Sequence, residues 1–299
     1  MERCLRYTIG REDEYKRIDL YLKEHGYSQK VIVGLKEAPS QILLNQDPVF
    51  VNKRLKNGDF LEIYISEEES SPNIIPEMIP LNIIYEDEDL LVVSKPAGMP
   101  IHPSVNHHTG TLANGIAGYY KKQGISYVFR CLNRLDRDTS GLVLLAKNPL
   151  SGAVLSKCVK ECGLHREYRA VVCGKLPQKG TIAEPIGRRP DSIVERMVDK
   201  KYGQKAVTHY ERLSCQNGYS YASIQLETGR THQIRVHMKY IGHPLPGDFL
   251  YYPDFTDIKR QALHSYRIWF PHPITGKPME FVDDIPEDMK MLINKRAED

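Results

Sequence analysis

The sequence predicts an α+β protein built from two units, and three observations lead to this prediction. Short apolar runs of strand length recur along the whole chain. Segments with helical spacing of apolar residues lie between these runs, and several of them end at a glycine. An acidic stretch rich in Ser and Pro, residues 66–80, buries too little apolar surface to order itself and separates two such series. We therefore expect a small unit over residues 1–69, a linker over 70–80 and a larger unit over 81–299.

The composition is that of an ordinary globular protein. Of the 299 residues, 41% are hydrophobic and 26% are charged, and the formal net charge is only +3. No run reaches the roughly 18 consecutive apolar residues of a membrane helix, and residues 1–4 lack the apolar region of a signal peptide. The six cysteines are scattered without a C-x-x-C pair, so we expect reduced thiols. These observations predict a cytoplasmic protein without a membrane partner, and we expect a monomer.

The first unit should begin with a strand and two short helices. Gly26 ends the first helix, and Ser28 is the expected cap of the second. Three further strands follow, and Asn57-Gly58 is a hairpin signal between the last two. The expected elements are a strand over 3–9, helices over 17–25 and 29–36, and strands over 42–44, 49–51 and 60–65.

The second unit is organised around the stretch of residues 128–147. Two carboxylates lie there among three arginines, namely Asp136, Asp138, Arg130, Arg134 and Arg137. A turn of small residues, 139–141, leads from them into an apolar run of buried-strand length, 142–146. A carboxylate is thus expected on a loop that enters the core, where a rigid scaffold can position a reactive group. A structural cluster of ion pairs that caps the strand would have the same residues.

Regular elements account for most of the remaining second unit. A hairpin over 83–94 opens it, and a later hairpin turns near Asn217-Gly218. Thr231 is the expected cap of a helix that ends at Gly242. The other expected elements are helices over 111–122 and 149–161 and strands over 166–174, 206–213 and 220–226.

Two groups of residues suggest a metal site, and neither has a full set of ligands. They are Cys158, Cys162 and His165, with the spacing C-x3-C-x2-H, and the three histidines His102, His107 and His108. The cysteine group lacks an evident fourth ligand, and the histidines lack accompanying carboxylates or cysteines. Small buried thiols on the inner face of a helix are the commoner case. We therefore expect no metal.

The most basic segment of the chain is residues 186–205. It has six Lys and Arg against three Asp and Glu, and Gly and Pro break it into loops. Such arms can follow a phosphate backbone, although a solvated charged loop would have the same composition. The candidate RNA-binding residues in it are Arg188, Arg189, Arg196, Lys200 and Lys201.

Four motifs of the second unit resemble the RluA family of RNA pseudouridine synthases. Residues 133–142 match the signature H-R-L-D-x-x-T-S-G-L, with Asn133 in place of the usual histidine. Residues 228–237 read T-G-R-T-H-Q-I-R-V-H, as in the family almost letter for letter. Residues 95–103 resemble its K-P-x-G-x-x-x-H-P segment, and residues 166–174 resemble its K-x-Y-x-A-x-V-x-G segment.

The resemblance implies a fold for both units. For the second unit it implies the pseudouridine-synthase fold, which is α+β with a central, mixed and largely antiparallel sheet beside an RNA cleft. The first unit resembles the S4 RNA-binding domain, an α+β domain of two small helices and short strands. Residues 1–69 have 11 Lys and Arg against 13 Asp and Glu. The resemblance therefore supports the S4-like fold better than it supports strong RNA binding by this unit.

The resemblance also implies the roles of individual residues. Asp136 takes the place of the catalytic aspartate, and Tyr168 takes that of the tyrosine that faces the active site. Arg230 corresponds to the arginine that pairs with the aspartate. Arg134 corresponds to the side chain that displaces the target base. Ile234 is expected to pack beneath the site, and Arg137 and Ile234 complete the candidate RNA-contacting residues.

The implied activity is the isomerisation of uridine to pseudouridine in structured RNA, with ribosomal RNA expected before transfer RNA. The reaction breaks the glycosidic bond, rotates the base and bonds C5 to the sugar while water is excluded. The target nucleotide must leave its stack, because its reacting atoms are unreachable within it. The family uses one ionised carboxylate and no metal or redox cofactor, so we expect no cofactor. Two rivals remain: a non-catalytic RNA-binding protein with the synthase fold, and a metal-dependent hydrolase or nuclease.

Overall fold

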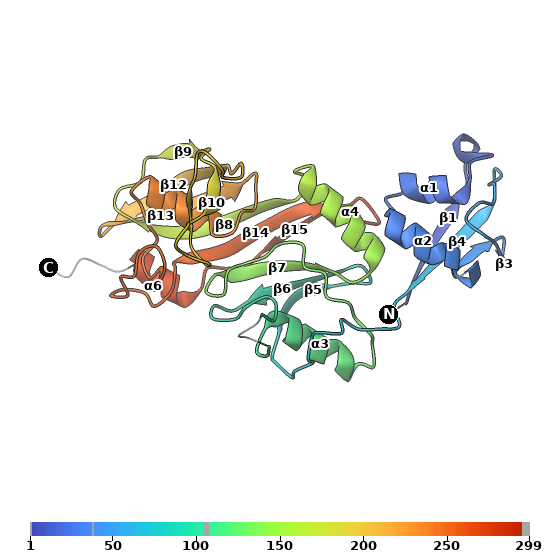
Figure 1. Cartoon of the computed structure of the whole chain (residues 1–299), viewed down its shortest axis with the longest axis horizontal. Helices are drawn as coiled ribbons and strands as arrows, with labels where there is room; N and C mark the ends of the chain where they lie inside the picture. The colour runs from blue at the N-terminus through green and yellow to red at the C-terminus, as the bar shows by residue number, and fades with distance from the viewer. Residues whose placement is uncertain (1, 38, 105–107, 295–299) are drawn as a thin grey trace.

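The structure, a computed structural model, describes residues 2–37, 39–104 and 108–294. These residues form two units, each with its own sheet and its own apolar core. In Figure 1 the N-terminal unit lies at one end of the molecule, and the long sheet of the larger unit lies beside it. Within the described ranges, no helix combines the length and the apolar character that a membrane crossing needs.

The N-terminal unit packs two helices against a four-stranded antiparallel sheet. Its strands lie in the order β1-β4-β2-β3. Ile18, Leu22 and Ile63, from a helix and the sheet, are fully buried in the core of this unit. The elements are β1 (Glu2–Thr8), α1 (Ile18–Glu24), α2 (Gln29–Glu37), β2 (Ile42–Leu44), β3 (Asp47–Pro48) and β4 (Phe60–Ser66), with short 3-10 turns at Arg11–Asp13 and Pro39–Gln41.

Two predictions for the strands of this unit are wrong. The third strand is β3 and lies before residues 49–51, because the chain reverses already at Asn45 and Gln46. Both residues adopt positive φ, 54° and 76°, as a tight hairpin turn requires. Asn57-Gly58 does form a turn, but β4 after it pairs with β1 and β2 and not with β3.

The larger unit is built on a nine-stranded sheet, and the predicted mixed, largely antiparallel sheet is confirmed. The strands follow the order β5-β6-β7-β14-β8-β13-β12-β9, and β15 pairs with β14. The pair β7–β14 is parallel, and the other neighbours are antiparallel. The strands are β5 (Asn82–Glu86), β6 (Leu90–Lys95), β7 (Ser140–Ala146), β8 (His165–Cys173), β9 (Lys179–Ile182), β12 (Thr208–Gln216), β13 (Tyr219–Leu226), β14 (Leu263–Pro271) and β15 (Pro278–Val282). The helices are α3 (Leu112–Lys122), α4 (Pro149–Lys160), α5 (Gln233–Tyr240) and α6 (Glu287–Asn294), and β10 (Ile186–Arg188) pairs with β11 (Arg196–Val198) in a separate hairpin.

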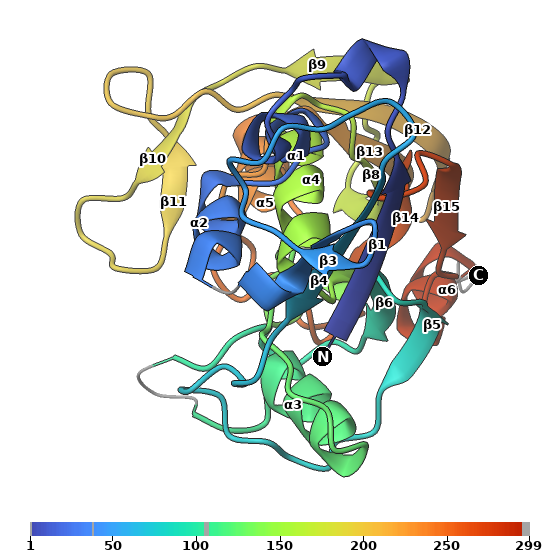
Figure 2. The same ribbon diagram turned by 90° about the vertical axis from the view of Figure 1, so that its right-hand side faces the viewer.

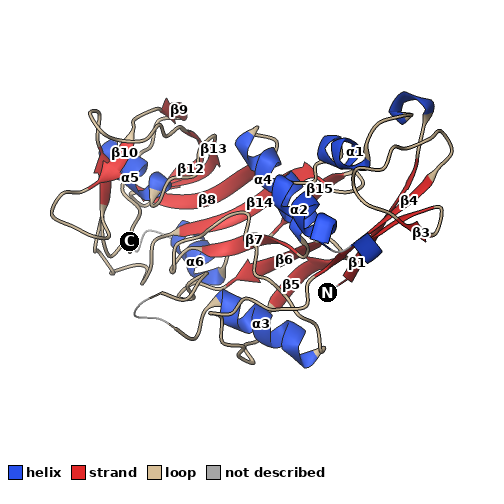
Figure 3. Cartoon of the chain, turned by 45° about the vertical axis from the view of Figure 1, so that its right-hand side comes forward, coloured by secondary structure: helices blue, strands red, loops and turns tan. Residues whose placement is uncertain are grey.

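Strands β6 and β7 are covered on both faces, which explains their continuous apolar sequences. Leu91 and Val143 belong to the core that includes residues of α3. Leu90 and Leu142 point the other way and pack in a second core with Leu155 of α4. Figure 3 shows α3 and α4 on opposite sides of the sheet. The loop that leads into β7 is therefore anchored to the most deeply buried part of the molecule.

The linker between the units packs along the larger unit. Ser71 N donates to Tyr127 O, and Phe129 N donates to Ser71 Oγ at 3.0 Å. Glu67, just before the predicted linker, forms an ion pair with Arg130. These contacts hold the acidic and Pro-rich sequence along the segment that leads to β7.

Helix α4 of the larger unit forms part of the contact with the N-terminal unit. Leu150 of α4 belongs to the apolar core of the N-terminal unit. Gly26 approaches Val154 so closely that an added Cβ would lie 2.7 Å from its methyl carbon. Arg3 of β1 donates to both carboxylate oxygens of the buried Asp89 at 3.2 and 3.0 Å. The two units are therefore held together by apolar packing and by a partly buried ion pair.

Candidate active site

Asp136 lies on the loop that leads into β7. The chain turns at Arg137–Asp138, and Thr139 N donates to Asp136 O at 3.2 Å to close the turn. The predicted turn of small residues is therefore displaced, because β7 begins at residue 140. Gly141 is inside the strand with a φ of +108°, and an added Cβ would collide with the backbone of Ser265 in β14. Glycine is required there so that the parallel neighbour can approach.

Asn133 and Lys95 hold this loop in place. The Asn133 amide donates to Leu142 O at 2.9 Å and accepts from Leu144 N at 2.8 Å. Buried Lys95 donates to Arg137 O at 2.9 Å and to two carbonyls of its own loop. Burial lowers the pKa of Lys95 to about 7, against the opposing charges of nearby carboxylates. Asn133, which stands where the resembled family usually has histidine, thus fixes the loop to β7 through the nitrogen and the oxygen of its side-chain amide.

Replacing Asn133 with alanine is expected to destabilise the protein by about 1–3 kcal/mol, because the buried Leu144 N–H loses its side-chain acceptor. Chemical denaturation of wild type and Asn133→Ala measures this loss. Asn52→Ala, at an exposed position of the N-terminal unit, is the matched control and should stay within about 0.5 kcal/mol. Equal stability of both variants would show that the amide does not hold the loop.

The partner of Asp136 is Arg235, on the inner side of α5. Arg235 Nη1 donates to Asp136 Oδ2 at 2.8 Å, and Nε and Nη2 donate to both oxygens of Asp248 at 2.7 and 2.8 Å. This corrects the prediction that Arg230 pairs with Asp136. Arg230 precedes the helix, is exposed, and donates from Nε to Lys205 O at 3.0 Å. The motif contains two arginines, and the helix turns the second one inward.

Two carboxylates keep Arg235 charged. Burial by itself would lower the pKa of Arg235, but hydrogen bonds to Asp248 and the charges of Asp136 and Asp248 raise it above its ordinary value. The rings of Phe249 and Tyr251 lie 5.5 and 5.0 Å from the guanidinium carbon. One cation between two carboxylates leaves a net negative charge. Asp136, with 26% of its side chain exposed against 1% for Asp248, is the carboxylate that can meet a ligand.

A left-handed residue sets the start of α5. The predicted cap Thr231 is wrong by one position: His232 is the N-cap, with a φ of +58° and no capping hydrogen bond from its side chain. Buried Gln233, the first residue of the helix, holds the preceding segment, since its Oε1 accepts from Arg230 N and Thr228 Oγ1, both at 2.9 Å. The reversal at His232 and the Gln233 amide together fix the direction in which α5 enters the site.

His232 also borders the carboxylate. Its Nε2 lies 3.9 Å from Asp136 Oδ1, and its Nδ1 shares a 2.9 Å hydrogen bond with the Tyr251 hydroxyl. Burial lowers the pKa of His232, and this outweighs the opposing charge of Asp136. The ring is therefore neutral at pH 7 and leaves Arg235 as the cation paired with Asp136.

Tyr168 and Ile234 form apolar walls next to Asp136. Both are buried, 5% and 4% exposed, and both belong to the main core. Burial raises the pKa of the Tyr168 phenol; Arg166 opposes this rise and Asp136 adds to it. The phenol is therefore neutral at pH 7 and can donate a hydrogen bond. Both residues line the same cavity as Asp136.

These side chains line one open cavity of about 770 Å³, which we call the Asp136 pocket. Two carboxylates line it, Asp136 and Glu227. Six cations line it as well, namely Arg134, Lys160, Arg166, Lys205, Arg230 and Arg235. A cavity of this size accommodates a small ligand, and the excess of positive charge suits a polyanion. Arg137 instead turns outward and pairs with Asp138 at 3.0 Å.

The basic candidates of residues 186–205 lie apart from the lining of this pocket, on the β10–β11 hairpin and the loop after it, which protrude in Figure 2. Their contacts are as follows: Arg189 pairs with Glu195 at 3.1 Å, Lys200 pairs with Glu184 at 3.5 Å, and Lys201 lies over the ring of Tyr202. Arg188 and Arg196 face each other in register across the hairpin. Arg196 Nη1 donates to the carbonyl oxygens of Val194 and Glu195 at 3.2 and 3.1 Å.

Asp87, Asp89 and His272 form the one group of three possible metal ligands among the described residues. The oxygens of both carboxylates already accept hydrogen bonds. Asp87 accepts from Tyr85 and from backbone amides, and Asp89 accepts from Arg3, Asn148 and Ser151. The group is thus explained as a hydrogen-bond network. Of the groups weighed from the sequence, His107 lies outside the described residues, and His165 stacks on Trp269 at 4.9 Å.

Sequence reasoning missed three residues of the site: Arg235, Asp248 and His232. A signal for two of them was available, because Arg235 and His232 belong to the same ten-residue motif as Arg230. Asp248 lies in the next loop and became recognisable only when the fold placed it against Arg235.

Known proteins resemble this chain over most of its length. A family model described as RNA pseudouridylate synthase matches residues 89–240. An RNA pseudouridine synthase of Bacillus subtilis (strain 168) is 43% identical over 274 residues, which cover 91% of this chain and 96% of that protein. Ribosomal large subunit pseudouridine synthase D of Neisseria meningitidis serogroup A is 37% identical and covers 85% of this chain and 71% of its own. The solved structure of human RNA pseudouridylate synthase domain containing 1 superposes with a TM-score of 0.57 at 25% identity, over 70% of this chain and 84% of that one.

Proposed function

The chain belongs to the RNA pseudouridylate synthase family, and we propose that it acts on ribosomal RNA with Asp136 as its catalytic carboxylate. The family gives the reaction, which is the isomerisation of uridine to pseudouridine in RNA. Ribosomal RNA is proposed because several relatives 35–37% identical are named ribosomal large subunit pseudouridine synthase D. We also propose that it works as a monomer in the cytoplasm, where ribosomal RNA would be accessible to it.

One observation carries the assignment of Asp136: its carboxylate is the exposed end of a buried Arg235–Asp248 pair inside an electropositive pocket. The guanidinium is fixed by two hydrogen bonds to Asp248, so it cannot turn away when a ligand binds. Asp136 is therefore held in one orientation, with its carboxylate facing the pocket. A preorganised negative charge of this kind stabilises the positive charge that develops on the sugar as the glycosidic bond breaks.

The neighbouring residues supply what the rest of the reaction needs. The N1–C1′ bond breaks, the base rotates, C5 bonds to C1′, and the C5 proton is lost while N1 gains one. Tyr168 and Ile234 present apolar walls that keep water from the freed base. The neutral Tyr168 hydroxyl can donate to a base or sugar oxygen, and the cations around the pocket can bind the flanking phosphates.

Arg134 is proposed to occupy the space that the flipped nucleotide leaves. It is exposed and lines the rim of the Asp136 pocket, two residues before the carboxylate. A guanidinium can stack on bases and donate to phosphates. Flipping costs a few kcal/mol from a stacked helix and least from an open strand.

Arg134→Ala is therefore expected to slow the reaction most on a stacked target. Single-turnover rates would be measured on two RNAs, one with the uridine in a stacked stem-loop and one with it in an open strand. We expect a rate loss about five- to thirtyfold larger on the stacked RNA, as one lost flipping contact of about 1–2 kcal/mol implies. Equal losses on both RNAs would assign Arg134 to bracing the loop.

The family assignment argues against the alternative of a non-catalytic RNA-binding protein, and so does the presence of Asp136 and Tyr168 in one pocket. The test is tritium release, because C5 loses its hydrogen in the reaction. Large-subunit ribosomal RNA labelled with tritium at uracil C5 should release label to solvent when incubated with the purified chain. Release from transfer RNA alone would move the substrate assignment to transfer RNA.

A further inference from the structure

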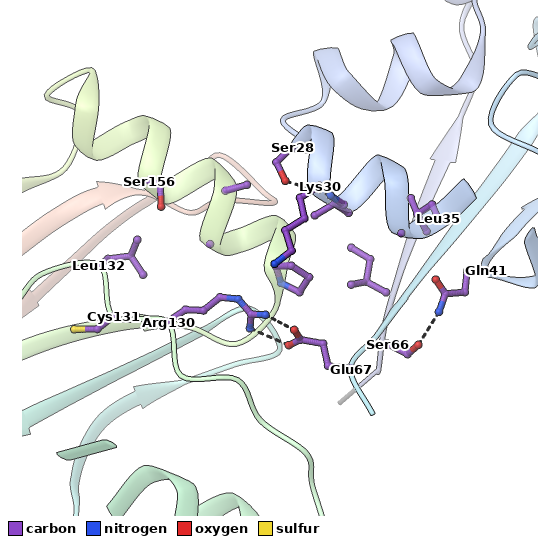
Figure 4. A pocket seen from close by; sticks show the side chains of 16 residues that line it. Ser28, Lys30, Leu35, Gln41, Ser66, Glu67, Arg130, Cys131, Leu132 and Ser156 are labelled. Carbon is purple, nitrogen blue, oxygen red and sulfur yellow. Dashed lines mark hydrogen bonds and ion pairs between the residues drawn. The ribbon is translucent and has the colours of Figure 1, made fainter. Parts of the chain in front are cut away.

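A second cavity lies between the two units, and we call it the interunit groove. It holds about 520 Å³ between α2 of the N-terminal unit and α4 of the larger unit (Figure 4). Small residues on both helices make the room, since Gly34 of α2 and Gly152 of α4 line it. A Cβ added at Gly34 would meet no atom within 4 Å. The groove therefore has room for an additional side chain. It is formed by the docking of the two units, because residues of both line it.

The interunit groove lies next to the Asp136 pocket. Cys131 and Leu132 line both cavities. These two residues lie four and five positions before Asp136, on the same loop. The two cavities therefore share a wall, which brings the interunit groove close to a target nucleotide in the Asp136 pocket.

The chemistry of the groove suits one nucleotide. Lys30 points from α2 into it (Figure 4), and within the described residues its ammonium group forms no ion pair. At the base of the groove, Arg130 and Glu67 form an ion pair, so their opposite charges neutralise each other. Lys30 is thus the uncompensated charge of the lining. The partly exposed apolar side chains of Val31 and Leu132 offer a surface for the face of a base.

We propose that the interunit groove binds a single-stranded nucleotide of the substrate RNA that flanks the target, with a phosphate at Lys30 and the base against the apolar wall. The inference rests on the RNA substrate of the proposed function. It gives the N-terminal unit a defined task, because α2 supplies one wall and, among the described lining residues, the one cation without an ion pair. In this proposal the N-terminal unit contacts the RNA strand next to the target nucleotide, and it does not bind a distant part of the RNA.

The test compares the affinity of the full chain for a stem-loop that contains the target uridine with and without a single-stranded overhang, placed at either end. An overhang at one end should strengthen wild-type binding about fivefold or more at 0.1 M salt, the value of one phosphate contact on a single strand. Lys30→Ala should remove that gain and lower the salt slope by about 0.7. Gly34→Leu should remove it by filling the groove, and it should fold, because leucine is a better helix former than glycine and meets open space.

Lys36→Ala is the matched control, because Lys36 is exposed on the same helix and is not part of the groove lining. It should keep the gain in affinity. The proposal is overturned if neither overhang strengthens wild-type binding, or if Lys30→Ala and Gly34→Leu both keep the gain. Conversion of the short stem-loop by the wild type tests the proposed function separately, since it needs no overhang.

Discussion

Asp136→Asn is expected to abolish pseudouridine formation while RNA binding is retained. Asparagine has the size of aspartate and can still accept a hydrogen bond from Arg235, which Asp248 continues to hold through two further hydrogen bonds. The fold should therefore survive, and what is lost is the negative charge that faces the sugar. We expect the single-turnover rate to fall by at least about 10⁴-fold, as for the removal of a catalytic group elsewhere.

Asp138→Asn is the matched control for this variant. Asp138 lies two residues away, accepts two hydrogen bonds from Arg137 and does not line the Asp136 pocket. Its substitution should leave the rate within a few-fold of wild type. Measurable product from Asp136→Asn under single-turnover conditions would remove Asp136 from its catalytic role.

Arg235→Met is expected to lower both the rate and the stability. Without the guanidinium, the fully buried Asp248 and the nearby Asp136 are left as unpaired like charges. Breaking a buried ion pair in this way costs about 3–5 kcal/mol of unfolding free energy. The rate should fall by several powers of ten in the folded fraction, because Asp136 loses its orientation. Thermal unfolding and single-turnover assays measure the two effects.

Arg230→Met, five residues earlier in the same motif, separates the two candidate partners. Its side chain is exposed and donates only to the Lys205 carbonyl, so stability should change by less than about 1 kcal/mol. Weaker RNA binding is expected, with a modest effect on the chemical step. Arg235→Lys separates the effect of the charge from that of the geometry, since lysine keeps the positive charge but loses the bidentate contact with Asp248. A loss in Arg230→Met as large as in Arg235→Met would restore Arg230 as the functional partner.

Local signals in the sequence predicted most regular elements. The helix expected over 111–122 is α3, which begins one residue later because Thr111 is its cap, and Gly124 follows it with a φ of +71°. Asn217-Gly218 forms the predicted hairpin turn between β12 and β13. Ser28 accepts from Val31 N at 3.4 Å, as expected of a cap. These features depend on neighbours within four residues, and so the local sequence is sufficient to predict them.

The errors arise where distant parts of the chain decide the outcome. Nothing within ten residues of Arg235 shows that it will be buried, because Asp248 lies 13 positions later and Asp136 lies 99 positions earlier. The positive φ of His232 then shifts the helix start by one residue. Docking of the units depends likewise on Arg3 and Asp89, which are 86 positions apart. The resemblance placed Asp136 and Tyr168 in one pocket, but the arginine inferred from it, Arg230, was the wrong one of the two in the motif.

The most direct test of the central claim is a map of pseudouridines in ribosomal RNA from cells that lack this gene. The map would be compared with maps from the same cells carrying either the wild-type chain or Asp136→Asn. We predict that at least one uridine of the large-subunit RNA is unmodified without the gene, is restored by the wild type and is not restored by Asp136→Asn. An identical map in all strains, or restoration by Asp136→Asn, would contradict the account.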